Sequence, residues 1–168
     1  DNGSSVNRLS DLPSPMDVIQ KLPVEKNGIY RSGVAVALTG NQTTALTYNL
    51  SDNNGLAVAS KTVTVSGPYH DSKNIDEIFS DYFRGSRNFQ GTLTISSSNG
   101  VPFATSNFRQ YKNSSFATLQ STASTGTTVI PHIAVGGGYD LESMIQNLES
   151  TPQTFVYSIK DQTGGNHN

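Results

Sequence analysis

The chain of 168 residues contains no cysteine and no tryptophan. The absence of cysteine excludes disulfides, thiolate catalysis and metal sites built from cysteine. Charged residues are scarce, at 14%, and the formal net charge is −2 without any run of lysine or arginine. Nucleic acids and anionic membranes attract basic patches, so this composition argues against both partners. No apolar run approaches the roughly 18 residues that a membrane-spanning helix needs.

Serine, threonine and asparagine are abundant instead, numbering 22, 17 and 15. This neutral polar composition is typical of a surface made of strands and turns. A chain of this length is expected to bury roughly two-thirds of its unfolded surface, which requires a true hydrophobic core. Low charge with many small polar residues is common in exported β-proteins. We therefore expect an all-β protein that is extracellular or on the cell surface, with its signal peptide already removed.

Two stretches of the chain, residues 43–55 and 152–164, resemble each other. Each alternates apolar and polar positions, as a half-buried strand does, and then enters a turn. One offset of 109 positions (164 − 55 = 109) aligns the two stretches without gaps. It pairs Leu46 with Phe155, Tyr48 with Tyr157, Leu50 with Ile159 and Val36 with Ile145. We infer a partial internal repeat of residues 34–55 with residues 143–164.

The chain is predicted to have three parts. Residues 1–27 contain three prolines, which exclude a long helix, so we predict an extended N-terminal arm. This arm either lies along the surface or donates a strand to a neighbouring subunit. Residues 28–164 are predicted to form a single antiparallel β-sandwich of the immunoglobulin-like, Greek-key type, with about eight to ten short strands. Residues 165–168 form a tail.

Local patterns place a helix and several turns within this sandwich. Apolar residues spaced from Ile75 to Phe83 form one stripe, which predicts a helix over residues 74–83 with Asn74 as its N-cap. The turn formers from Asp52 to Gly55 predict a hairpin. A change of the apolar face in the following strand predicts a β-bulge near Ser60 or Lys61.

Several short motifs occur in order along residues 28–164. They are Gly33–Ala37 with Asp52-x-x-Gly55, then Asn74–Phe79, Phe89–Ser98, Phe103–Arg109 leading to Phe116–Leu119, and Pro131–Gly138. Together they resemble a β-sandwich repeat module of unknown function that is found in secreted and cell-surface bacterial proteins. An Asn-Pro pair of that module is replaced here by Thr39-Gly40-Asn41. The resemblance implies an extracellular, non-catalytic and often tandem building block, and it brings no catalytic residues.

The sequence contains no pattern typical of an enzyme or a metal site. His70, His132 and His167 have no partner at ligand spacing, so no metal site is predicted. The glycines that follow His132 lack the strand-to-helix context of a phosphate-binding loop. No Gly-x-Ser-x-Gly motif occurs. We predict no enzymatic activity, no catalytic residue and no cofactor.

The predicted function is that of a structural subunit in a cell-surface fibre or tandem array. The predicted strand at 153–160 has no following strand to pair with, so its open edge must be filled by the arm or by another chain. The expected partners are copies of the chain itself, in a head-to-tail polymer, or neighbouring domains. The residues expected to mediate assembly are Val18, Ile19, Phe155, Tyr157 and Ile159.

The alternative is a carbohydrate-binding or adhesive β-sandwich module of a larger secreted protein. Such a module presents exposed aromatic rings on which sugars stack. Without tryptophan, the rings available for glycans are those of Tyr30, Tyr69, Tyr111 and Tyr139.

Overall fold

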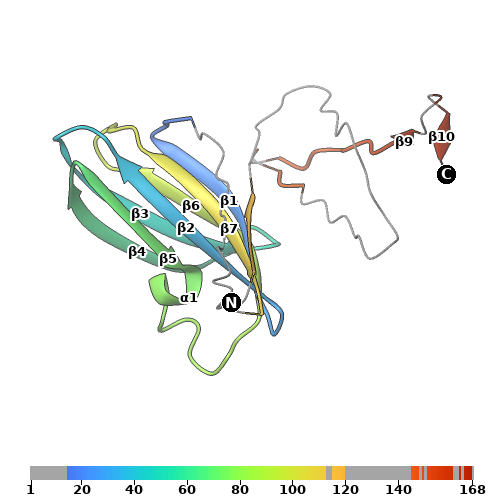
Figure 1. Cartoon of the computed structure of the whole chain (residues 1–168), viewed down its shortest axis with the longest axis horizontal. Helices are drawn as coiled ribbons and strands as arrows, with labels where there is room; N and C mark the ends of the chain where they lie inside the picture. Colours follow the sequence, from blue (N-terminus) through green and yellow to red (C-terminus); the bar gives the residue numbers. More distant parts are fainter. Residues whose placement is uncertain are drawn as a thin grey trace, which may run out of the picture. The chain divides into compact units, whose positions relative to one another are not determined.

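The computed structural model describes residues 15–112, 115–119, 145–147, 149, 151–160, 163 and 165–167. The chain divides into two compact units, Asp1–His132 and Ile133–Asn168. In the described residues, the first unit holds strands β1 to β8 and helix α1, and the second holds β9 and β10 (Figure 1). The boundary between the units falls inside the single domain predicted over residues 28–164.

The first unit is built on one antiparallel sheet of eight strands, which confirms the predicted all-β class. The order is β4-β3-β6-β1-β2-β7-β8, and β5 pairs with β2 beside this path. The strands are β1 (Ile19–Lys26), β2 (Tyr30–Leu38), β3 (Thr43–Asp52), β4 (Ala57–Ser66), β5 (Tyr69–Asn74), β6 (Phe89–Ser97), β7 (Ala104–Tyr111) and β8 (Ser115–Leu119).

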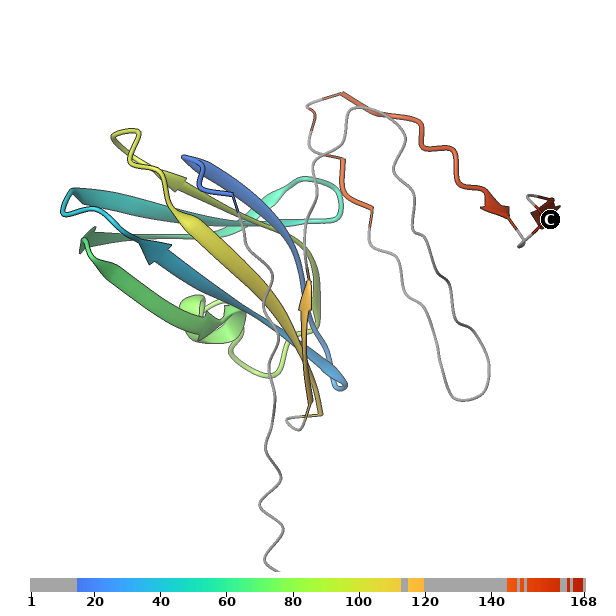
Figure 2. The same cartoon turned by 45° about the horizontal axis from the view of Figure 1, so that its top comes forward.

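The sheet curls because β1 and β2 diverge directly after the hairpin that joins them. Their only paired positions are Lys26 and Arg31, whereas β1 pairs with β6 over its whole length. From Gly33 to Leu38, β2 pairs with β5 instead. The result is a curled half-barrel, which Figures 1 and 2 show from two directions. Alternate side chains of the strands fill its inside, and the buried aliphatic ones are Leu22, Val24, Val34, Val36, Leu38, Leu46, Leu50, Val65, Leu93 and Ile95.

Strand β1 lies in the middle of the sheet, although residues 1–27 were predicted to be a separate arm. Pro23 lies within β1 without breaking it, because its missing N–H costs no bond to β6. The Ser97 N–H donates to the Val18 carbonyl at 3.0 Å, so the even-numbered positions of β1 bond to β6. Pro23 therefore turns its backbone away from β6, and its carbonyl accepts from Asn107 Nδ2 at 2.8 Å. A proline is tolerated in a strand where its nitrogen faces away from the ladder.

Helix α1 is shorter than predicted. It spans Ile75–Ile78 and begins after the predicted N-cap, Asn74, but the chain leaves helical geometry at Phe79 (φ −114°, ψ 50°). The apolar stripe is buried as expected, because the following turn carries Phe79 and Phe83 into the core. Phe83 meets Phe89 of β6 edge-on, with ring centroids 5.9 Å apart. Tertiary packing of the aromatic rings thus replaces the second and third helical turns.

Candidate functional site

The C-terminal segment is where assembly was predicted, and its described part is almost entirely exposed. Phe155, Tyr157 and Ile159 retain 54%, 53% and 41% of their accessible surface. The strand predicted over 153–160 is wrong for most of its length: only Ile159–Lys160 forms a strand, β9, paired with β10 (Asn166–His167). Residues 152–158 have no strand pairing. An extended chain cannot hold a ladder without a neighbour, which accounts for the difference.

The same apolar residues have buried counterparts in the first unit. At the offset of 109, Phe155, Tyr157 and Ile159 correspond to side chains of β3 that face the core, and Ile145 corresponds to one of β2. These counterparts, Leu46, Tyr48, Leu50 and Val36, retain at most 6% of their surface. The pairing of Lys160 with Asn166 also falls at the offset positions of the pairing of Ser51 with Ala57, where β3 turns into β4.

Val18 and Ile19, the other predicted assembly residues, belong to the sheet of their own chain. The Val18 carbonyl accepts the N–H of Ser97, and Ile19 begins β1 and pairs with Ser96. The side chain of Ile19 is half exposed. A strand in the middle of a sheet is not free for donation, so these two residues do not form a donor strand.

Strand β4 is an open border of the sheet. It is ten residues long and pairs with β3, and among the described strands nothing pairs along its other side. Of its side chains only Val65 is buried. Figure 1 shows β4 beside β3 at one border of the sheet. Long exposed edge strands are sites where another strand can add.

Two of the four tyrosines predicted as stacking residues lie together. Tyr30 on β2 and Tyr111 on β7 have ring centroids 5.7 Å apart, and Tyr111 is 40% exposed. Tyr69 lies on β5, where its hydroxyl donates to Asp71 Oδ2 at 3.2 Å. Tyr139 lies outside the described residues. Among the three of these tyrosines that the structure describes, the rings of Tyr30 and Tyr111 are the ones in contact.

A buried ion pair beside Tyr30 was not predicted from the sequence. Arg109 Nε contacts Glu25 Oε1, and their side chains are only 13% and 7% exposed. The guanidinium carbon of Arg109 lies 3.5 Å from the centroid of the Tyr30 ring, a cation–π contact. Asn27 Nδ2 donates to Glu25 Oε2 at 3.3 Å. No local pattern marks this cluster, because it depends on the strand order. Strands β1 and β7 lie on either side of β2, where Ser32 pairs with Arg109 and its hydroxyl accepts the N–H of Glu25.

A second polar cluster lies on the inner side of β3 and β5. Burial raises the pKa of the Tyr48 phenol, and the nearby Tyr69 and Asp71 raise it further. The ammonium of Lys73 holds the pKa of Asp71 below its ordinary value. The phenol of Tyr48 is therefore fully protonated at neutral pH and the carboxyl of Asp71 is ionised. This arrangement offers a satisfied ion pair and no activated nucleophile.

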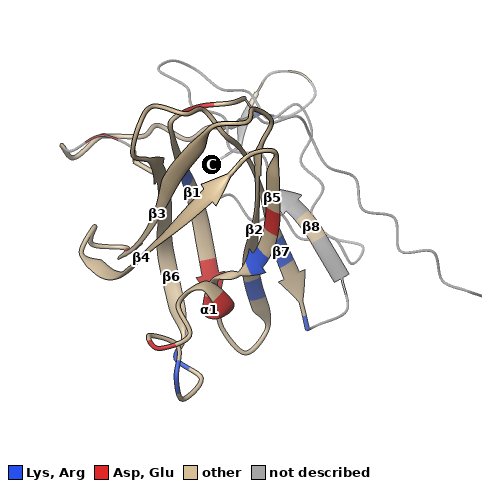
Figure 3. Ribbon diagram, turned by 90° about the vertical axis from the view of Figure 1, so that its left-hand side faces the viewer, with Lys and Arg blue, Asp and Glu red and all other residues tan. Residues whose placement is uncertain are grey.

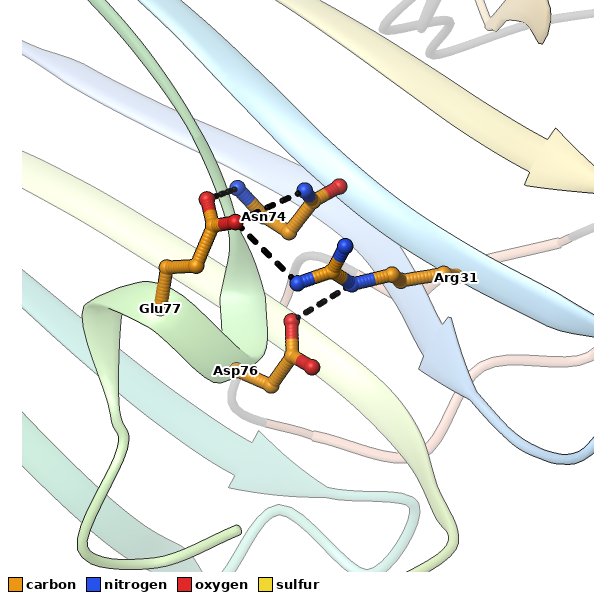
Figure 4. Close-up of polar contacts among 4 residues, drawn as sticks. All are labelled: Arg31, Asn74, Asp76 and Glu77. Atoms are coloured by element: carbon orange, nitrogen blue, oxygen red, sulfur yellow. Dashed lines mark hydrogen bonds and ion pairs between the residues drawn. The ribbon is translucent and has the colours of Figure 1, made fainter. Parts of the chain in front are cut away.

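The start of α1 is tied to β2 by a charged network. Arg31 of β2 donates to Asp76 Oδ1 at 2.8 Å and to Glu77 Oε1 at 3.1 Å. Figure 4 shows how these side chains meet. Glu77 Oε2 also accepts the backbone N–H of Asn74 at 2.9 Å, one half of a capping box. Figure 3 shows the acidic residues of α1 close to a basic position of β2. These acids therefore stabilise the start of the helix, and their carboxylates are occupied by Arg31 and the Asn74 N–H.

This network predicts an acid-dependent loss of stability. The bond from the Asn74 N–H, assisted by Arg31, lowers the pKa of Glu77 below its ordinary value of 4.5. A carboxyl whose pKa is lower in the folded state adds stability above its unfolded pKa and loses it as pH falls through the folded value. We expect the free energy of unfolding to fall more steeply below about pH 4.5 in the natural chain than in Glu77→Gln. Urea unfolding followed by circular dichroism from about pH 7 to about pH 3 measures this. Parallel curves for the two proteins would contradict it.

In the part of the chain that the structure describes, no three His, Asp or Glu side chains are grouped to hold a metal ion. No helix among the described residues is long and apolar enough to cross a bilayer. No family model, curated protein or solved structure matches this chain.

Proposed function

We propose that this chain is a non-catalytic, extracellular structural protein, a subunit or module of a cell-surface fibre or tandem array whose chains are joined by β-strand complementation. The observation that carries the proposal is the exposure of Phe155, Tyr157 and Ile159, whose counterparts in β3 are buried. Apolar residues that alternate along an extended segment gain from a neighbouring strand that covers one face and bonds to the backbone.

Simple energetics support this role. Fully burying a large apolar side chain stabilises by roughly 1.5–3 kcal/mol. The three side chains are about half exposed, so covering them is worth on the order of 3 kcal/mol before the backbone bonds are counted. Ordering the segment opposes this gain. An association of this size is weak for one contact and suits a repeated assembly, where many contacts act together.

The internal repeat is part of this proposal. We infer that residues 143–164 repeat residues 34–55, and that the pairing of Lys160 with Asn166 is the counterpart of the β3–β4 hairpin. The second unit then contains a partial copy of the β2–β3 region of the first. A contact between different surfaces of identical chains does not close on itself, so such modules assemble head to tail.

The experiment is a measurement of mass against concentration for the whole chain, by size-exclusion chromatography with light scattering, with electron microscopy of the largest species. We expect the natural chain to form oligomers that lengthen with concentration, and Tyr157→Asp to remain monomeric. Val156→Asp is the matched control, because Val156 is 92% exposed and is not one of the alternating positions 155, 157 and 159. A natural chain that stays monomeric on concentration, or equal behaviour of the two variants, would contradict the proposal.

A carbohydrate-binding or adhesive module is the second candidate, and the proximity of Tyr30 and Tyr111 favours it. Tyr111 offers an exposed ring, and the ammonium of Lys112 lies 5.2 Å from its centroid. One face of Tyr30 is already occupied by Arg109, which leaves little flat surface for a sugar. Glycan-array binding that Tyr111→Ala abolishes would favour this candidate over the structural one.

A further inference from the structure

The free border of β4 has the length and the side-chain pattern of an acceptor. With ten residues, it is long enough to pair with all eight residues of segment 153–160. Four side chains of β4 face the inside of the half-barrel: Ala59, Lys61, Val63 and Val65. Their partners on β3 are, in the same order, Leu50, Tyr48, Leu46 and Thr44. Val63 is still 36% exposed. A strand added along the open border of β4 would pack its own side chains against these four, as β3 does from the other border.

Lys61 limits which strand can add. A charge on the inward side of an edge strand opposes indiscriminate pairing, because an incoming apolar strand would bury it. On the occupied side of β4, the position opposite Lys61 is Tyr48. Tyr157 is the counterpart of Tyr48 at the offset of 109. A donor that places Tyr157 opposite Lys61 brings an aromatic ring beside the ammonium, where a cation–π contact compensates for its burial.

That single match fixes the register of the whole segment. In an antiparallel pair with Tyr157 opposite Lys61, Phe155 lies opposite Val63 and Ile159 lies opposite Ala59. All three apolar side chains of the donor then face the inward row of β4. The other borders fit less well: β8 has five residues, and β5 has six and carries the Asp71–Lys73 ion pair.

The backbone of β4 is also oriented for this register. The Gly67 N–H donates to the Gln42 carbonyl, so Val63 and Lys61 direct their backbone groups toward β3. The alternate residues Ser60, Thr62 and Thr64 direct theirs outward, where a donor strand would bond. Val63 and Phe155 would then be a non-hydrogen-bonded pair, with Cα atoms about 4.5 Å apart.

We propose that the outer border of β4 accepts residues 153–160 of a second copy of this chain, antiparallel, with Tyr157 opposite Lys61. This inference rests on the proposed function and names the partner surface of the same contact. It makes each chain a donor through its C-terminal segment and an acceptor through β4. Because donor and acceptor are different surfaces, the contact propagates from chain to chain.

The absence of cysteine allows a direct test by disulfide trapping. Val63→Cys and Phe155→Cys are prepared as separate proteins, mixed at a concentration where the natural chain associates, and oxidised. A Cα separation of about 4.5 Å lies within the range that a disulfide spans, so we expect a cross-linked heterodimer on a non-reducing gel. Thr64→Cys mixed with Phe155→Cys is the control, because adjacent residues of a strand point to opposite faces, and it should yield at least tenfold less product.

The outcomes separate this inference from the function on which it rests. Association that Tyr157→Asp abolishes, without the 63–155 cross-link, would overturn the β4 acceptor and leave strand complementation in place. Equal cross-linking of residues 63 and 64 would overturn the register. A natural chain that does not associate would overturn both the inference and the proposed function.

Discussion

Replacing Glu25 by alanine is expected to lower the free energy of unfolding by about 3–5 kcal/mol. The substitution leaves the guanidinium of Arg109 buried, with 13% of its side chain exposed and without its carboxylate partner. Removing one member of a buried ion pair costs more than the pair itself contributes, because the remaining charge keeps its desolvation penalty. Urea unfolding of dilute protein, followed by far-ultraviolet circular dichroism, measures the loss.

The double variant Glu25→Leu with Arg109→Met is the control for this result. It removes both charges and keeps apolar volume where the two side chains meet over β2, so we expect it to lose much less stability than Glu25→Ala. A single variant that unfolds at the same urea concentration as the natural chain would show that this ion pair does not hold β1 against β7.

Leu46→Ala and Phe155→Ala are expected to differ sharply, although the two residues occupy equivalent positions of the inferred repeat. Leu46 is fully buried, so its truncation should cost about 2–5 kcal/mol of unfolding free energy. Phe155 is 54% exposed in the single chain, so its truncation should cost less than about 1 kcal/mol in dilute protein. In concentrated protein, Phe155→Ala should instead weaken association.

Val156→Ala provides the matched control, since Val156 is 92% exposed and is not one of the alternating positions of the segment. It should change neither quantity. Equal destabilisation of dilute protein by Leu46→Ala and Phe155→Ala would mean that Phe155 is already buried within its own chain. The exposed segment would then need no partner.

Local patterns predicted the features of this fold that depend on neighbours in sequence. The turn from Asp52 to Gly55 forms as expected: the Gly55 N–H donates to the Asp52 carbonyl, and Gly55 adopts φ +78°. The Asp52 carboxylate accepts the N–H groups of Asn54 and Leu56. Asn74 caps α1, and the apolar stripe that follows it is buried. Each of these depends on a few adjacent residues whose chemistry is sufficient to specify the geometry.

Features that depend on distant residues could not be predicted. The place of β1 between β6 and β2 cannot be predicted from local sequence, and the three prolines of residues 1–27 indicated only an extended arm. The predicted bulge exists but lies earlier, where Ala57 and Ala59 pair with Ser51 and Leu50. The bulge position depends on the register with β3, which the sequence of β4 alone does not contain.

The candidate site shows the same division. The alternation of Phe155, Tyr157 and Ile159 was readable from the sequence, and so was its likeness to β3. The free border of β4 became visible only once the strand order was known, because an edge is a property of the whole sheet. The ion pair of Glu25 with Arg109 could not be anticipated either, since neither strand's sequence shows that both strands flank β2.

Amide hydrogen exchange of residues 153–160, compared between dilute and concentrated protein, tests the central claim most directly. Strand complementation predicts fast exchange in dilute protein and strong protection on concentration, at alternate amides of the segment and of β4. Strand β3 serves as the internal reference and should be protected at both concentrations. Fast exchange of the segment at every concentration, with β3 protected, would show that no other backbone pairs with it and would contradict the proposed assembly.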